Sequence, residues 1–147
     1  MKKFRFRLEM LLRHRQNVEE KERTKFSSIR QMLQAELDRL DELNASQDLT
    51  NKELARKKSG ECDGREIAWY YRFLDRLSRE IEASSRRISQ LEQQLDEQRQ
   101  IMVAASRDKK MLENLRKKQE QEFNLSLERE EQKSIDEMVV TRYAAKQ

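Results

Sequence analysis

The sequence predicts an all-α protein in which two long helices form an antiparallel coiled-coil hairpin, the second helix being longer and overhanging. The first observation is composition: 41% of the 147 residues are charged, 35% are hydrophobic, and there is no proline. Such a chain lacks material for a thick core, but paired helices each need only a narrow apolar stripe. The other two observations are a single glycine-containing turn and a seven-residue apolar repeat around it, a regularity that argues against disorder.

The turn is predicted where the only two glycines lie, in the stretch "KKSGECDGRE". Asp63, followed three residues later by Glu66, is typical of a capped helix start. We therefore expect one domain over residues 1–147, with helix one at about 4–57, the turn at about 58–64 and helix two at about 65–140.

Helix two carries the clearer repeat. Its first row is Ile67, Leu74, Ile81, Ile88, Leu95 and Met102, and its companion row is Tyr70, Leu77, Ser84, Leu91, Gln98, Ala105 and Leu112. Two such rows make a continuous stripe along a helix, so we expect them to face helix one. We call the contact between the two helices the seam.

Helix one has a matching but weaker repeat. Its first row is Phe26, Leu33, Leu40, Gln47 and Leu54, its companion row holds Arg30, Leu37 and Asn44, and near its start the stripe drifts toward Val18, Leu11, Leu8 and Phe4. In an antiparallel hairpin, the residue numbers of two facing residues add up to a constant. Leu54 with Ile67 and Leu40 with Ile81 give the same sum, so apolar residues of one helix are expected to face apolar residues of the other.

Helix two is expected to outrun helix one. From about Gln119 no part of helix one would lie beside it, yet this overhang, residues 119–147, contains Phe123, Leu127 and Met138. Exposed apolar residues of this kind favour completion by a partner, and a frayed tail is the alternative.

Charges concentrate at the end of the hairpin that carries both termini. Residues 2–15 hold six basic and one acidic side chain, and residues 107–118 hold six basic and two acidic ones. We call these two stretches the basic collar. The overhang is acidic. A basic region and an acidic region therefore lie next to each other at this end of the hairpin, although the net charge of the chain is only +4.

The opening segment "FRFRLEMLLRHR" raises the question of nucleic-acid or membrane binding. Phe4, Leu8, Leu11 and Leu12 are expected on one helical face within the seam, with the arginines on its rim. The basic patch is modest and no motif of a known nucleic-acid reader is present, so both roles stay minor alternatives.

Catalysis and metal binding are not expected. There is no glycine-rich phosphate loop, and His14 has no evident nucleophile to serve. One histidine and the single Cys62 make neither a disulfide nor a zinc cluster. No apolar run is long enough to span a bilayer, and the N-terminal stretch is too charged for a secretory signal, which predicts a soluble cytoplasmic protein without a cofactor.

An aromatic pair lies near the turn. Trp69 and Phe73 are four residues apart and off the seam, whereas Leu77 belongs to it. The pair is expected either to pack back over the seam or to form a docking patch for a partner.

Several stretches together resemble the FliJ family of the bacterial flagellar export apparatus. They are "FRFRLE" at Phe4, "REIAWYYRFLDRLSREI" after the turn, "KKMLENLRKKQEQEF" in the basic stretch, and "DEM" at Asp136. The resemblance covers essentially the whole chain.

The resemblance implies a stalk-like coiled coil that binds the export ATPase FliI, promotes its hexamer assembly and ATP hydrolysis, and couples it to the export gate FlhA. It also implies contact with substrate chaperones and a cytoplasmic, peripheral location at the inner membrane. The implied ATPase-binding residues are Phe4, Arg5, Phe6, Arg7, Leu8, Leu11, Leu12, Phe123, Leu127 and Met138. The implied gate-binding residues are Trp69, Phe73 and Leu77. The alternatives are the equivalent stalk of a virulence secretion system and a structural coiled coil that dimerises through its seam.

Overall fold

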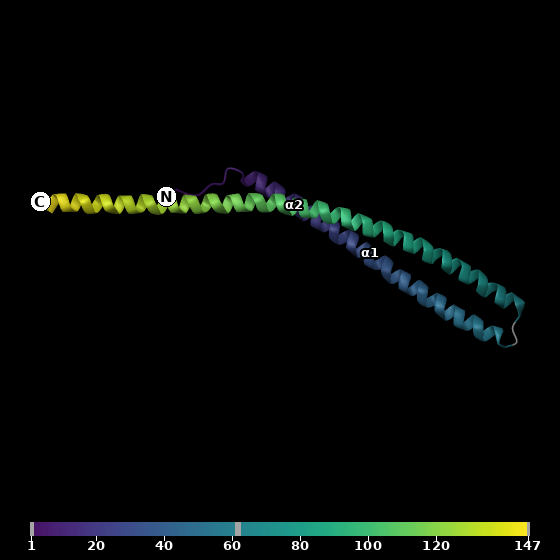
Figure 1. Ribbon diagram of the computed structural model, residues 1–147. Helices are drawn as coiled ribbons and strands as arrows, with labels where there is room; N and C mark the ends of the chain where they lie inside the picture. The colour runs from purple at the N-terminus through teal and green to yellow at the C-terminus, as the bar shows by residue number, and fades with distance from the viewer. Residues whose placement is uncertain (1, 61–62, 147) are drawn as a thin grey trace. The chain divides into compact units, whose positions relative to one another are not determined.

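The computed structural model describes residues 2–60 and 63–146 and contains two helices, α1 (Glu9–Lys58) and α2 (Gly64–Lys146) (Figure 1). The predicted all-α hairpin with a longer second helix is confirmed. The packing divides into two units, Glu22–Met102 and Met1–Lys21 with Val103–Gln147. Cys62, the single cysteine of the sequence, lies outside the described residues.

The predicted repeat of α2 is the side of the helix that packs on α1. Every residue of its two heptad rows, from Ile67 to Leu112, is buried or half-buried. Leu77, Ile88 and Ala105 are among the most buried hydrophobic side chains. A strict seven-residue repeat therefore located the contact surface of α2 correctly along most of its length.

The first row of α1, from Phe26 to Leu54, also lies in the seam, but its companion row was predicted wrongly except at Leu37, which is half-buried. Arg30 and Asn44 of the predicted row are exposed. The companion row of the structure, buried or half-buried throughout, is Glu22, Ile29, Glu36, Leu43 and Thr50. Its two glutamates are tolerated in the seam because α2 supplies hydrogen-bond donors to both carboxylates, as described below.

The connection between the helices uses caps on both sides. The Ser59 amide donates to the Ala55 carbonyl at 3.3 Å and the Gly60 amide to the Lys57 carbonyl at 3.3 Å, which closes the last turn of α1. The Asp63 carboxylate accepts a hydrogen bond from the Arg65 amide at 3.2 Å, so Asp63 caps α2 as its position predicted.

The N-terminal segment differs from the prediction, because helix one begins at Glu9 and not at about residue 4. Phe4 and Phe6 therefore precede the helix, and Phe6 is nevertheless buried. In a helix, residues two apart point about 200° away from each other, so both rings could not face α2. A non-helical segment lets the ring of Phe4 lie 5.7 Å from that of Phe123 while Phe6 is also covered.

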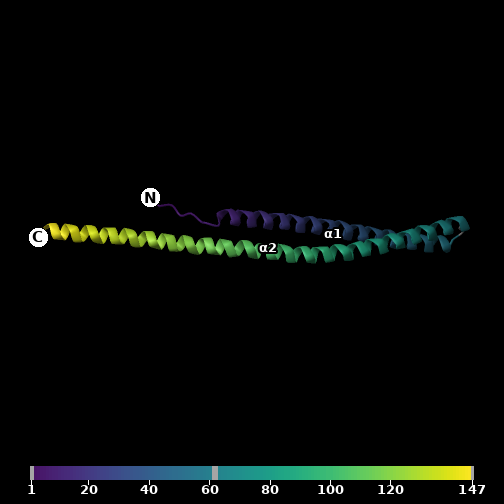
Figure 2. The ribbon, with the colours of Figure 1, turned by 90° about the horizontal axis from the view of Figure 1, so that it is seen from above.

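This segment also shortens the uncovered part of α2. Non-helical chain can advance about 3.3 Å per residue against 1.5 Å in a helix, so residues 2–8 reach further along α2 than predicted. Lys2 lies 3.6 Å from Glu130, and Phe123 and Leu127 are half-buried. Every residue from 128 to 146 is exposed, and in both views this last stretch of α2 has no helix beside it (Figures 1 and 2). It stays helical to Lys146, past the predicted end near residue 140.

Candidate functional site

The residues implied to bind the ATPase divide into packed and exposed groups. Those that pack within the hairpin are Phe4, Phe6, Leu8, Leu12, Phe123 and Leu127. Those exposed to solvent are Arg5, Arg7, Leu11 and Met138. The expected single helical face for the first four apolar residues is wrong, since Leu11 points outward and Phe4 lies outside the helix.

Part of the basic collar is engaged in cross-helix ion pairs. Arg116 donates to the Glu9 carboxylate at 3.0 Å, and Arg15 lies 3.4 Å from Asp108. A further pair joins Lys109 to the buried Glu19. These charges hold the N-terminal end of α1 against α2.

Other basic groups of the collar face the solvent. Arg5, Arg7 and Arg13 are all exposed, on the segment before α1 and on its first turns. They are therefore the collar arginines best placed to meet a partner's acidic groups.

A polar layer lies in the seam of the other unit. The Ser84 hydroxyl, 2% exposed, donates to the Glu36 carboxylate at 2.8 Å, and Arg87 donates to the same carboxylate at 3.3 Å. The hydrogen bond from Ser84 is the main reason that the pKa of Glu36 lies below its usual value. Burial acts in the opposite direction, and the positive charge of Arg87 adds to the lowering.

A second polar layer lies about four helical turns of α1 away. The Gln98 amide donates to both the backbone carbonyl of Glu22, at 3.1 Å, and its carboxylate. The hydrogen bond from Gln98, followed by one from Lys25, lowers the pKa of Glu22. Both carboxylates are thus held ionised inside the seam, which ties the register of the helices to specific donors.

An aromatic cluster occupies the start of α2. The Trp69 and Phe73 rings stack with centres 5.4 Å apart and planes 3° from parallel, and Tyr70 meets Trp69 edge-on at 5.2 Å. Trp69 is 55% exposed and Phe73 is half-buried. The prediction of an off-seam aromatic pair is therefore confirmed, and the alternative that both rings pack back over the seam fails for Trp69.

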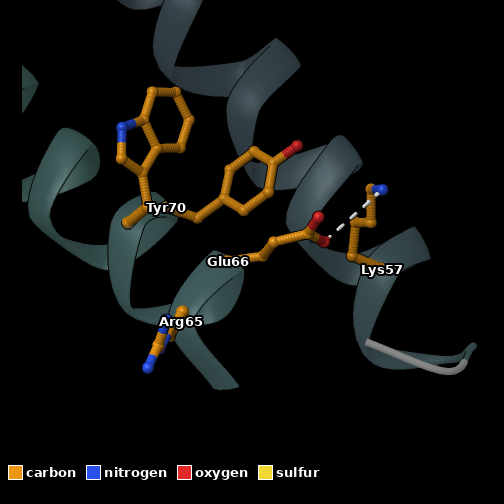
Figure 3. A pocket seen from close by; sticks show the side chains of 5 residues that line it. Lys57, Arg65, Glu66 and Tyr70 are labelled. Carbon is orange, nitrogen blue, oxygen red and sulfur yellow. Dashed lines mark ion pairs between the residues drawn. The ribbon is translucent and has the colours of Figure 1, made fainter. Parts of the chain in front are cut away.

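A shallow open depression of about 340 Å³ adjoins this cluster, lined by Lys57, Arg65, Glu66, Trp69 and Tyr70. Figure 3 shows the Glu66 carboxylate reaching toward Lys57 of α1, 3.6 Å away, while Arg65 points away from α1. Tyr70 points toward α1. The depression thus combines an aromatic wall with a charged rim in which Lys57 is paired with Glu66.

Leu77 lies apart from this surface. It is 5% exposed and belongs to the seam, as its heptad position predicted. Contact of Leu77 with a partner would require the hairpin to open, whereas Trp69 is accessible without any change.

The structure also exposes apolar residues that sequence analysis did not single out. Val103 and Met111 border an open groove of about 490 Å³ together with Arg107 and Lys110. They lie outside both heptad rows, so the seam pattern does not predict them. A second set of apolar residues at helical spacing, on another face of α2, is the sequence pattern that identifies them.

Within the described residues, no helical stretch has both the length and the hydrophobicity needed to span a bilayer. The same part of the chain holds no group of three or more His, Cys, Asp or Glu side chains placed to bind a metal ion.

Residues 4–147 match the family model described as "FliJ: Flagellar FliJ protein". The match begins at Phe4 and runs through the collar, both helices and the overhang. The chain belongs to the FliJ family. Members of this family are non-catalytic proteins of flagellar export, so the chain is a flagellar export-related protein. Searches of curated proteins and of solved structures found no significant match.

Proposed function

We propose that this FliJ-family protein acts in flagellar protein export as a stalk that binds the export ATPase FliI, promotes its hexamer assembly and ATP hydrolysis, and couples it to the export gate FlhA. The observation that carries the proposal is the end of α2. Residues 128–146 continue as a helix with every residue exposed, including Ile135, Met138 and Tyr143. An exposed apolar helix beside a basic collar suits insertion into a protein ring.

The ATPase-facing surface combines two kinds of contact. Exposed Arg5, Arg7 and Arg13 supply positive charge, which attracts and orients a partner. Leu11 and Met138 supply apolar area. The packed aromatic and aliphatic residues of the same segment position this surface rather than meeting the partner. A stalk changes the activity of a ring only if it binds the states of the ring's subunits with different affinity.

The gate-facing surface of the proposal is the aromatic cluster near the turn. Trp69 and Phe73 present a stacked pair beside the charged rim of the depression, and aromatic residues are common at the energetic centres of protein interfaces. Binding of export chaperones is a further part of the proposal, as is a cytoplasmic location peripheral to the inner membrane.

The decisive experiment is ATP hydrolysis by purified FliI from the same organism with and without this protein, together with the mass of the ATPase by light scattering. We expect faster turnover and a shift from monomer toward hexamer. If neither changes while both proteins are folded, the stalk function is wrong and chaperone binding becomes the leading role.

A matched pair of variants tests the charge component. Arg7→Glu with Arg13→Glu should weaken stimulation, whereas Arg30→Glu with Arg56→Glu, an equal charge change at exposed positions in the other unit, should not. Equal stimulation by both variants would remove the collar from the proposed interface. Circular dichroism should show that both variants keep their helical content.

The family match, described as a flagellar protein, favours export at the flagellum over a virulence secretion system. Dimerisation through the seam is disfavoured because the chain fills its own seam, with Leu77 and Ile88 of α2 buried there.

A further inference from the structure

The far side of α2 carries a second apolar stripe in the unit that includes the overhang. Successive helical residues are 100° apart, which places six exposed side chains within about 120° of one another, opposite the seam residues Ala105 and Leu112. We call them the outer stripe: Val103, Met111, Leu125, Ile135, Val139 and Tyr143. Each is between 47% and 68% exposed. Isolated exposed apolar residues need no explanation, but a repeating row on one face of a helix does.

Charges on the same face differ between the two halves of the outer stripe. The first half has only basic charges, on Arg107, Lys110, Lys117 and Lys118. The second half has the carboxylates of Glu128 and Asp136, together with Arg129 at the edge of the face. All seven side chains are exposed. The half toward the turn is therefore strongly basic, and carboxylates are confined to the half toward the C-terminus.

The spacing of the apolar residues fits a second copy of the same helix. If a second α2 lies antiparallel with the two-fold axis at the level of residue 123, facing residues have numbers that add to a constant. Val103 then faces Tyr143 near the middle of the face, whereas Met111 and Ile135 lie at the same level but at opposite edges of the face. The two remaining members of the stripe face the long side chains of Gln121 and Arg107, whose methylene groups can cover them.

The charges fit the same register. Lys110 faces Asp136, and Lys118 faces Glu128, so each of these lysines meets a carboxylate. Lys117 and Arg129 lie at the same level but at opposite edges of the face, where solvent screens this like-charge pair. Two attractive pairs per half thus outweigh one screened repulsion.

We propose that two copies of this chain associate through the outer stripe, antiparallel and related by a two-fold axis. An isologous interface requires a self-complementary surface, and the lysines and carboxylates at symmetric distances from the axis supply one. A parallel arrangement in register would set Lys110 against Lys110 and Asp136 against Asp136, which is repulsive. The helical contact would run for about 60 Å, since residues 103–143 rise 1.5 Å each. The dimer would cover Ile135 and Tyr143, which the stalk proposed above presents to the ATPase ring, so self-association and ATPase binding would compete for this end of α2.

Sedimentation equilibrium of the full chain tests the inference. We expect a mass that rises with concentration from 17.8 kDa toward twice that value, and dissociation as salt screens the charge pairs. A mass of 17.8 kDa throughout the concentration series would overturn the proposal.

Charge exchange tests the register. Lys110→Glu with Lys118→Glu should weaken self-association about tenfold, and so should Glu128→Lys with Asp136→Lys. An equimolar mixture of the two variants should recover the wild-type affinity as a heterodimer, because every reversed charge then meets its opposite. Failure of the mixture to recover would refute this antiparallel pairing even if the wild type dimerises.

Removing the positive charge of Arg129 should strengthen self-association instead of weakening it. Arg129→Glu places a carboxylate on the edge of the face that carries Lys118 of the second copy and should strengthen self-association. Weaker association of Arg129→Glu would contradict the register.

Two neighbouring residues provide a matched apolar control. Val139 lies on the outer stripe and is 60% exposed, whereas Met138 is 56% exposed but points about 100° away, outside the stripe. Val139→Asp should abolish the dimer and Met138→Asp should leave it intact. Equal effects of the two substitutions would contradict the assignment of the face.

Discussion

Ser84 of α2 donates a 2.8 Å hydrogen bond to the carboxylate of Glu36 of α1 inside the seam, where apolar side chains are the rule for coiled coils. Each of these two polar side chains therefore relies on the other for its hydrogen bond inside the seam. Neither residue is well accommodated alone, since a carboxylate without donors and a hydroxyl without an acceptor are both costly in a seam.

A single replacement at this contact should therefore lower thermal stability, whereas replacement of both residues should not. Ser84→Ala should lower the melting temperature because Glu36 loses its shortest hydrogen bond. Combining Glu36→Leu with Ser84→Ala should restore or exceed wild-type stability, since the carboxylate is replaced by an apolar side chain. Thermal unfolding followed by circular dichroism measures both. A double variant less stable than Ser84→Ala would show that the polar pair stabilises the hairpin outright.

Stability should fall in acid because of Glu36 and Glu22. The pKa of each lies below the ordinary value of 4.5, through hydrogen bonds from Ser84 and Gln98 respectively. The contribution is complete above the unfolded-state pKa and is lost as pH falls through the lower folded-state pKa. Urea unfolding at pH values between about 5 and about 3 should show the loss. In Ser84→Ala with Gln98→Ala the dependence should be shallower, and an unchanged slope would contradict this assignment.

Seam and surface positions near the turn should respond differently to alanine. Leu77→Ala removes a buried side chain and should cost about 2–5 kcal/mol of unfolding free energy. Trp69→Ala removes an exposed ring that stacks on Phe73 and should cost less than about 1.5 kcal/mol. Chemical unfolding compares the two. A loss of gate binding by Trp69→Ala with stability retained would then report contact, whereas a loss by Leu77→Ala would not.

Gly64→Ala should stabilise the protein by about 0.4–1 kcal/mol. Gly64 is the first residue of α2, it does not have a positive φ, and an added Cβ would meet no atom within 4 Å. Ala68→Gly, at an exposed position one turn later, is the matched control and should destabilise by about 1 kcal/mol. Destabilisation by Gly64→Ala would indicate that the first turn of α2 needs the freedom of glycine.

Phe6→Ala should release the N-terminal segment while leaving the helices folded. Phe6 is buried although it precedes α1, so its ring helps to hold residues 2–8 in place. Limited trypsin digestion should cut faster after Arg5 and Arg7, with little change in the main unfolding transition. Leu11→Ala, at an exposed position nearby, should leave the cleavage rate unchanged. No acceleration in Phe6→Ala would mean that other contacts of the segment, such as Phe4 against Phe123, suffice to hold it.

The sequence alone determined the helices, the turn and the seam of α2. Heptad spacing and capping are local properties: Ile67 to Leu112 share a face whatever α1 does, and Asp63 caps the helix that follows it. Trp69 was likewise placed outside the seam by phase alone.

Only the tertiary structure decided which companion row of α1 faces α2 and how the chain begins. Glu36 and Glu22 enter the seam because Ser84 and Gln98, far away in sequence, donate to them there. A spacing pattern scores these glutamates as surface residues. Similarly, Phe4 and Phe6 precede the helix, where the ring of Phe4 lies against Phe123 of α2 and Phe6 is also buried. Long-range partners settle the location of polar and terminal residues, since burial of a polar group or an aromatic ring depends on what the opposite surface offers.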